Sequence, residues 1–356
     1  MSERPHLFGL CAPDLVRELA ALGVACTEPE ARRLLGRVIS EGKDDLLPRK
    51  PVKREVRVAV EEHVDRAPLE LVERVKDDFD GFVKYLFRSP DGALHEAVRI
   101  PLHKENCFTV CLSSQVGCAM RCDFCATGRL GLQRNLRAWE MVAAFRAVRD
   151  EARREAVPGR VTGVVFQGQG EPLQNYDEVI QAARVLSDPC GGRVTAGAIT
   201  ISTVGLVPQI RRFTAERQPF RLIVSLTSAV TERRKKLLPV AGKIPMEELA
   251  EAIREHDRSR SGGRVTVAWV LMGGVNHDEE EVLRLKELFH GVRLRLNLID
   301  VNDDREGGYR RATDEERKAF YAKLQVLGVP IVRRYSGGAN RNAACGMLAA
   351  VHHAAQ

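Results

Sequence analysis

The chain has 356 residues, of which 44% are hydrophobic and 29% are charged, an ordinary globular composition that excludes wholesale disorder. No apolar run approaches the ~18 residues of a membrane span, and the first residues lack the pattern of a secretory signal. The net charge of +7 weakly favours a polyanionic partner. We therefore expect a cytoplasmic protein with one large domain and a smaller appendage.

The first 75 residues are predicted to form a small helical domain. Apolar residues recur at helical spacing in three segments, at 12–22, 28–41 and 53–64. The basic stretch 48–54 lies among them, and we expect it to dock RNA through phosphate contacts. Residues 76–103 are then predicted to form a β-hairpin extension around the turn Ser89-Pro-Asp-Gly92.

Strand and helix patterns alternate along residues 104–340. Strands are predicted at 108–112, 163–167, 198–202, 222–226, 265–271, 293–298 and 330–333. Helices are predicted at 138–154, 176–187, 206–216, 246–258, 278–289, 313–326 and 342–353. Such alternation predicts an α/β fold with a parallel sheet and crossover helices. We interpret it as a partial (β/α)6 barrel, similar to a TIM barrel, with its chemistry at the carboxyl ends of the strands.

The nine cysteines are clustered, with five between residues 107 and 125. Their odd number and the missing export signal argue against a disulfide framework. Three of them form the segment Cys118-Ala-Met-Arg-Cys122-Asp-Phe-Cys125, directly after the first barrel strand. Three thiolates leave a coordination position open, whereas a structural zinc normally has four ligands. A zinc site completed by His103, or chance clustering, is the alternative.

This cysteine loop, followed by Ala126-Thr-Gly128, resembles the radical S-adenosylmethionine (SAM) superfamily. The resemblance implies one [4Fe–4S] cluster per subunit, held by Cys118, Cys122 and Cys125. The free iron of the cluster would chelate the amino and carboxylate groups of SAM. An electron donor such as a flavodoxin-type reductant would then start cleavage to a 5′-deoxyadenosyl radical.

A glycine-rich turn, Gly168-Gln-Gly-Glu-Pro172, ends the second barrel strand. Glycines let a ligand approach the backbone closely. The turn resembles the Gly-Glu-Pro element with which the superfamily holds the methionine amino group. Small hydroxyl and amide groups at later strand ends could bind ribose, carboxylate and adenine edges. The expected cofactor-binding residues are Gly170, Glu171, Ser202, Ser225, Leu226, Thr227 and Asn302.

Three further motifs resemble the radical methyl synthases of RNA adenosine, the RlmN/Cfr family, over roughly residues 85–350. They are Glu96-Ala-Val-Arg-Ile-Pro101, Cys111-Leu-Ser-Ser-Gln-Val-Gly-Cys118 and Asn342-Ala-Ala-Cys345-Gly-Met-Leu348. The last would make residues 341–356 a C-terminal segment that carries the methyl group. The cysteines outside these motifs are expected to be structural: Cys11, Cys26, Cys107 and Cys190.

The resemblance implies a reaction that uses two SAM molecules per turnover. C2 and C8 of adenine are not nucleophilic, so direct methyl displacement fails. Cys345 would take a methyl group from one SAM, and the radical from the second would remove a hydrogen from that S-methyl group. The S–CH2 radical would add to the adenine carbon, and Glu96 would accept the ring proton. Cys111 would then form a disulfide with Cys345 and release the methylated base, and cellular thiols would reduce the disulfide.

The substrate implied by the resemblance is an adenosine of 23S ribosomal RNA, with tRNA as a further target, and the enzyme would act as a monomer. Several positions depart from the family pattern and put the substrate in question. Thr227 replaces a usual His, Gln167 and Gln169 replace Met, and Asp300-Val-Asn302 replaces Pro-x-Asn. The alternatives are a radical SAM enzyme with a non-RNA substrate, a family member with another RNA target, and a non-enzymatic iron–sulfur or zinc RNA-binding protein.

Overall fold

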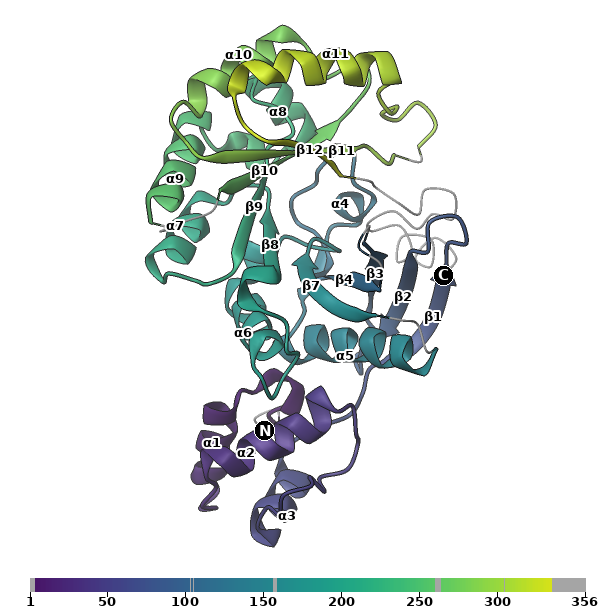
Figure 1. The fold of residues 1–356 in the computed structure, drawn as a ribbon, viewed down its shortest axis with the longest axis vertical. Coiled ribbons are helices and arrows are strands. Elements are labelled where there is room, and N and C mark those ends of the chain that lie inside the picture. The colour runs from purple at the N-terminus through teal and green to yellow at the C-terminus, as the bar shows by residue number, and fades with distance from the viewer. Residues whose placement is uncertain are drawn as a thin grey trace.

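The structure is a computed structural model that describes residues 4–102, 104, 106–155, 159–259, 264–303 and 305–334. Its centre is a sheet of ten strands (Figure 1). In spatial order they are β1 (Glu70–Lys76), β2 (Val83–Arg88), β3 (Leu94–Pro101), β4 (Cys107–Leu112), β7 (Arg160–Phe166), β8 (Ile199–Thr203), β9 (Arg221–Ser225), β10 (Val265–Leu271), β11 (Leu294–Asp300) and β12 (Ile331–Arg334). A separate two-stranded sheet joins β5 (Gln115–Gly117) to β6 (Leu132–Asn135).

The large sheet changes character at β4. Strands β1 to β4 pair antiparallel, whereas β4 to β12 pair parallel. The predicted α/β class is confirmed, and the seven predicted barrel strands all occur. Within the described residues the sheet stays open, with β1 and β12 at its two edges, as a partial barrel requires. Strand β1 has no predicted counterpart, because its four charged residues suit an exposed edge and hide the strand pattern.

The described residues contain eleven α-helices, of which those from α5 onwards connect successive parallel strands, as the alternation predicts. They are α1 (Ala12–Ala21), α2 (Glu28–Leu35), α3 (Arg54–His63), α4 (Ala126–Leu130), α5 (Ala138–Arg154), α6 (Tyr176–Ser187), α7 (Val207–Ala215), α8 (Thr231–Leu237), α9 (Met246–Ser259), α10 (Glu279–Leu288) and α11 (Asp314–Leu324). The short helices α4 and α8 were not anticipated, and the helix predicted at 342–353 lies outside the described residues. None of the described helices has the length and apolarity needed to cross a membrane.

Helices α1 to α3 lie at one end of the molecule, beyond α5 and α6 (Figure 1). The ring of His6 stacks on that of Trp139 in α5, with centroids 4.2 Å apart. The hydroxyl of Ser40 donates to the carbonyl of Gly191 over 2.6 Å, and the Gln181 amide in α6 donates to the carbonyl of Gly9 over 2.9 Å. Polar and aromatic contacts therefore attach the N-terminal helices to the outer side of the core.

The sheet formed by strands β2, β3 and β4 has two faces that pack against different parts of the molecule. Side chains alternate along a strand, so neighbours in sequence point to opposite sides. Tyr85, Phe87 and Leu112 belong to the main apolar core together with Phe145 of α5. A separate cluster on the other face contains Phe82, Val98, Cys111 and Val165. The second face continues towards the carboxyl ends of the parallel strands.

Candidate active site

A pocket opens at the carboxyl ends of the parallel strands, where a partial barrel is expected to bind its ligands. It encloses about 1050 Å³ of empty space, part of it open to solvent. Its wall combines the cysteine loop after β5, the glycine turn after β7 and the ends of β8 to β11. Segments more than 180 residues apart in sequence therefore meet here.

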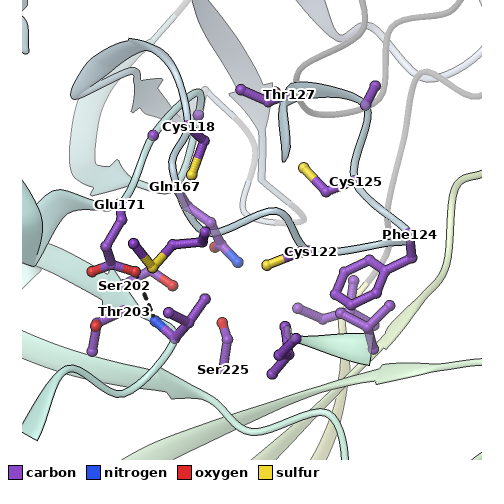
Figure 2. A pocket seen from close by; sticks show the side chains of 18 of the residues that line it. Cys118, Cys122, Phe124, Cys125, Thr127, Gln167, Glu171, Ser202, Thr203 and Ser225 are labelled. Atoms are coloured by element: carbon purple, nitrogen blue, oxygen red, sulfur yellow. Dashed lines mark hydrogen bonds between the residues drawn. The ribbon is translucent and has the colours of Figure 1, made fainter. Parts of the chain in front are cut away.

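The three motif cysteines line this pocket, and their sulfur atoms point towards a common space (Figure 2). Cys118 and Cys122 are buried, and Cys125 precedes the first turn of α4. Burial raises the pKa of the Cys118 thiol to about 12 and moves the pKa of Cys122 well above its usual value. Without a bound cation these thiols keep their protons, whereas metal coordination deprotonates a thiol outright.

The cysteines are not arranged around a single ion. Within the part of the chain that the structure describes, no group of three or more His, Cys, Asp or Glu side chains could hold one metal ion. His103, the proposed fourth ligand of a zinc site, lies outside the described residues. Thiols spread around a shared space suit a polynuclear cluster, in which each cysteine binds a different iron.

The glycine turn after β7 can only be built from glycine at two positions. Gly170 has a φ of +96°, and a Cβ there would lie 2.6 Å from the Cβ of Gln115. A Cβ on Gly168 would lie 2.8 Å from the hydroxyl oxygen of Ser113. Both glycines line the pocket, so the turn presents bare backbone to a ligand.

Glu171 is the buried carboxylate of the pocket, with 1% of its surface exposed. Its Oε1 accepts the backbone N–H of Leu173 over 3.0 Å, and its Oε2 accepts that of Val204 over 2.8 Å. Burial raises the pKa of Glu171 to about 7 despite these hydrogen bonds. Because each oxygen has a second lone pair, a ligand ammonium group could still bind and favour the ionised form.

Five of the seven predicted cofactor residues line the pocket: Gly170, Glu171, Ser202, Ser225 and Asn302. Leu226 and Thr227 are fully buried and do not line it. Thr227 has a φ of +62°, which is rare for a β-branched residue, and its Oγ1 has no hydrogen-bond partner among the described residues. Thr127 and Asp300 also line the pocket but were not anticipated. Asp300 could have been predicted from the sequence, because it stands two residues before the predicted Asn302 at a strand end.

Gln167 departs from the family pattern and stands at the pocket wall. Its Oε1 accepts a hydrogen bond of 2.8 Å from Nη1 of Arg334, at the end of β12. Strands β7 and β12 are not neighbours in the sheet. This contact therefore crosses the mouth of the partial barrel and joins the two sides of the pocket.

Two of the three predicted catalytic residues lie on the sheet face that continues into the pocket. Glu96 in β3 and Cys111 in β4 are buried. Cys111 is paired in register with Val165 of β7, two residues before the pocket residue Gln167. Cys345 lies outside the described residues, so its predicted disulfide with Cys111 is not described. Cys11, Cys26, Cys107 and Cys190 are free thiols away from the pocket.

Comparisons with known proteins agree with this geometry. Residues 112–286 match the model of the Radical SAM superfamily. A protein of Anaeromyxobacter sp. (strain Fw109-5), named "Probable RNA methyltransferase", is 47% identical over 345 residues, which cover 96% of this chain and 98% of the relative. The "Dual-specificity RNA methyltransferase RlmN" of Syntrophobacter fumaroxidans is 39% identical over 321 residues, covering 90% and 91%. The chain belongs to the RlmN family of radical SAM RNA methyltransferases.

The fold comparison agrees with this assignment. The crystal structure of a radical SAM methyltransferase from Sphaerobacter thermophilus superposes with a TM-score of 0.87 at 35% identity, covering 97% of this chain and 99% of that one. This radical SAM RNA methyltransferase is therefore an enzyme that depends on SAM. Its family implies an iron–sulfur cluster of the [4Fe–4S] type.

The residues present fit a negatively charged cofactor assembly. Arg234 in α8 is 1% exposed and donates to the carbonyls of Val204, over 2.7 Å, and of Leu226. Burial lowers the pKa of Arg234 to about 10, so the guanidinium stays charged at neutral pH, and the Cys122 thiolate would stabilise that charge. Its Nε has no hydrogen-bond partner among the described residues. A cluster of cysteine thiolates would supply the compensating negative charge.

Proposed function

We propose that this methyltransferase transfers a methyl group to C2 or C8 of an adenosine in RNA, through an S-methylcysteine at Cys345. The target proposed is 23S ribosomal RNA, with tRNA as a further substrate. The observation that carries the proposal is the placement of Glu96 and Cys111 on the sheet face that continues into the cysteine-lined pocket. A radical enzyme without methyl transfer would need neither group there.

The cofactors supply a carbon radical, and the chain holds them. We assign Cys118, Cys122 and Cys125 to the cluster. Glycine backbone and the Glu171 carboxylate would hold the methionine end of SAM. The pocket residues Ser202, Ser225 and Asn302 would orient the rest of SAM, while Leu226 and Thr227 could act only through the backbone that shapes the pocket rim.

The chemical roles of the remaining residues follow from their side chains. The Glu96 carboxylate accepts the proton that leaves the adenine carbon, and the electron pair of that C–H bond stays with the ring. The Cys111 thiol loses its proton and attacks the sulfur of Cys345, so a disulfide forms and the bond from that sulfur to the methylene carbon breaks. The electron pair of the broken bond goes to the methylene carbon, which takes a proton and becomes the methyl group. The unpaired electron left by the radical addition would return to the cluster. Two SAM molecules are consumed per turnover, and a flavodoxin-type donor supplies the reducing electron.

The remaining parts of the chain receive supporting roles. We propose that residues 1–75 form an RNA-docking domain, that 76–103 form a β-hairpin extension of the barrel core 104–340, and that 341–356 carry the methyl group. The side chains of Arg49, Lys50, Lys53 and Arg54 are exposed, as phosphate contacts require. The enzyme would act as a monomer.

Mass spectrometry of nucleosides tests the proposed function. Ribosomal RNA and tRNA are compared between a deletion strain and its parent, and loss of a methyladenosine is the expected result. Its retention time against C2-methyl and C8-methyl standards names the carbon, and we expect C2. If neither RNA pool changes, the substrate is not one of these RNAs, and a radical SAM enzyme with another substrate becomes the better hypothesis.

The role of Cys345 needs a separate experiment with the reconstituted holoenzyme. Cys345→Ala should abolish methylation while cluster binding and SAM cleavage persist, because those steps use other residues. Cys190→Ala is the matched control, since Cys190 is a half-buried thiol remote from the pocket. Full methylation by Cys345→Ala would refute the S-methylcysteine intermediate.

A further inference from the structure

A buried ion pair joins strands β2 and β3. Nζ of Lys84 lies 3.9 Å from Oε2 of Glu96, and the two side chains are 0% and 1% exposed. This distance gives a Coulombic contact rather than a direct hydrogen bond. A buried charge is costly unless an opposite charge compensates it, so each of these side chains offsets the cost of burying the other.

Strand register places this ion pair on the reactive face of the sheet. Lys84 is paired with Val98, Val98 with Cys111, and Cys111 with Val165. Paired residues share a face, so Lys84 and Cys111 lie in one row across the strands. Glu96 is two residues from Val98 and shares that face. The ion pair thus lies on the side that continues to the pocket, opposite the side covered by α5.

The backbone of Glu96 is tied to the glycine turn through Ser113. The hydroxyl of Ser113 donates to the carbonyl oxygen of Glu96 over 2.7 Å, and the same hydroxyl accepts the N–H of Gln169 over 3.0 Å. One side chain therefore connects the strand that carries the proton acceptor to the turn that lines the pocket. The main chain of Glu96 is fixed in this way, and its carboxylate faces the ammonium group of Lys84.

A structural role explains this ion pair poorly. Replacing a buried ion pair with apolar residues of similar volume is often neutral or stabilising. Apolar packing suits the surroundings of the pair, because Phe82, Val98 and Val165 form an apolar cluster on the same face. A charged pair on the reactive face therefore suggests a demand of the reaction.

We propose that Lys84 is a positioning residue for methylation, whose ammonium group orients the Glu96 carboxylate to accept the proton from the adenine carbon. This inference rests on the proposed function, in which Glu96 is the proton acceptor. Lys84 acts through Glu96 and touches neither the substrate nor the cofactors in this role. It should therefore affect turnover more than RNA binding.

The test uses the reconstituted holoenzyme with Lys84→Met, Lys84→Arg, Glu96→Gln and the double variant Lys84→Met/Glu96→Gln. Lys84→Met should lower kcat for methylation by at least about 10-fold, within the scale of general-base effects, with little change in KM for RNA. Cleavage of SAM to 5′-deoxyadenosine should persist in every variant. Lys84→Arg should recover part of the lost kcat because it retains the charge.

The double variant shows whether Lys84 acts through Glu96. In the Glu96→Gln background, Lys84→Met should cause no further loss of kcat, because the acceptor is already absent. If the losses of kcat caused by the two single substitutions multiply in the double variant, the inference is overturned. A Lys84→Met enzyme with the parent's kcat would also overturn it. If Lys84→Met does not fold, Lys84→Gln provides the same comparison with a polar head group.

Arg99→Met is the matched control. Arg99 is a buried cation on the same strand as Glu96, but its guanidinium pairs with Glu155, directly after the end of α5, over 3.1 Å on the opposite face. Its loss should lower the melting temperature and leave kcat of the folded enzyme unchanged. A parent enzyme that methylates no RNA would overturn the proposed function and the role of Lys84 together. If the parent methylates RNA and Lys84→Met has the same kcat, only the role of Lys84 is overturned.

Discussion

The two faces of strands β2 to β4 are made by the same short segments, yet only one of them carries the side chains that we propose take part in the reaction. The face towards α5 carries Tyr85, Phe87 and Leu112, which belong to the apolar core. The other face carries Lys84, Glu96 and Cys111. Because side chains alternate along a strand, residues next to each other in sequence serve stability on one side and reactivity on the other. Substitutions should therefore separate into two classes according to the face they alter.

The largest effect is expected at the pocket itself. Cys122→Ala removes one of the three thiols that face the common space, so the holoenzyme should lose most of its bound iron and all cleavage of SAM. Iron content, visible absorption and 5′-deoxyadenosine formation measure the loss. Cys26→Ala, at a thiol in the N-terminal helical region, should leave all three at the parent's level. A Cys122→Ala protein with full iron content would contradict the cluster assignment.

A substitution on the core face should affect only stability. Phe87 is fully buried beside Tyr85, with ring centroids 6.3 Å apart. Phe87→Ala should lower the free energy of unfolding by about 3–5 kcal/mol, because a cavity replaces the ring. The exposed neighbour Arg88→Ala should change it by less than about 0.5 kcal/mol. Denaturant unfolding measures both, and the folded Phe87→Ala enzyme should keep the parent's kcat. A lower kcat would show that the two faces are coupled.

A substitution on the reactive face should instead lower activity and leave stability nearly unchanged. Cys111→Ala removes the thiol proposed to release the product, so RNA bonded to Cys345 should accumulate and free methylated RNA should fall by about 100-fold or more. Electrophoresis of labelled RNA with the protein detects the adduct, and the melting temperature should change little. Cys107→Ala at the start of the same strand is the control. Release of methylated RNA at the parent's rate would refute the role of Cys111.

Periodicity predicted most of this fold because its signal is local. The helices at 138–154 and 176–187 have the predicted bounds. The signal fails for short or charged elements: α8 has seven residues, four of them basic, and β1 is a charged edge strand. Burial and strand pairing in three dimensions determine the secondary structure of such segments, and neither can be read from the order of residues.

The site was predictable where a motif carries its own chemistry. The spacing of the cysteines and the Gly-Glu turn indicate the pocket from the sequence alone. Leu226 and Thr227 failed to reach it because the chain turns sharply after β9 and buries them. No sequence motif includes Lys84. Only the register of β2 against β3 brings its ammonium group to Glu96, and a shift of one residue would place it on the other face.

The smallest effect that separates the faces is a pH dependence on the core side. His95 alternates with Glu96 along β3 and lies against Phe87 with ring centroids 5.9 Å apart. Burial lowers the pKa of His95 to about 4, below the value of about 6.5 expected in the unfolded chain. The unfolded state therefore binds the proton first. The stability contributed by neutral His95 is fully present above about pH 6.5 and is lost as the pH falls towards 4.

At pH 5 this difference in pKa should cost the parent roughly 2 kcal/mol of unfolding free energy relative to pH 7. His95→Gln does not titrate in this range, so that part of the loss should disappear. Denaturant unfolding of both proteins at pH 7 and pH 5 measures it, and the difference between the proteins cancels the contribution of the other carboxyl groups. An equal loss in both proteins would mean that His95 is charged in the folded state. The core face would then hold a charged imidazole against Phe87 in addition to the Arg99–Glu155 ion pair.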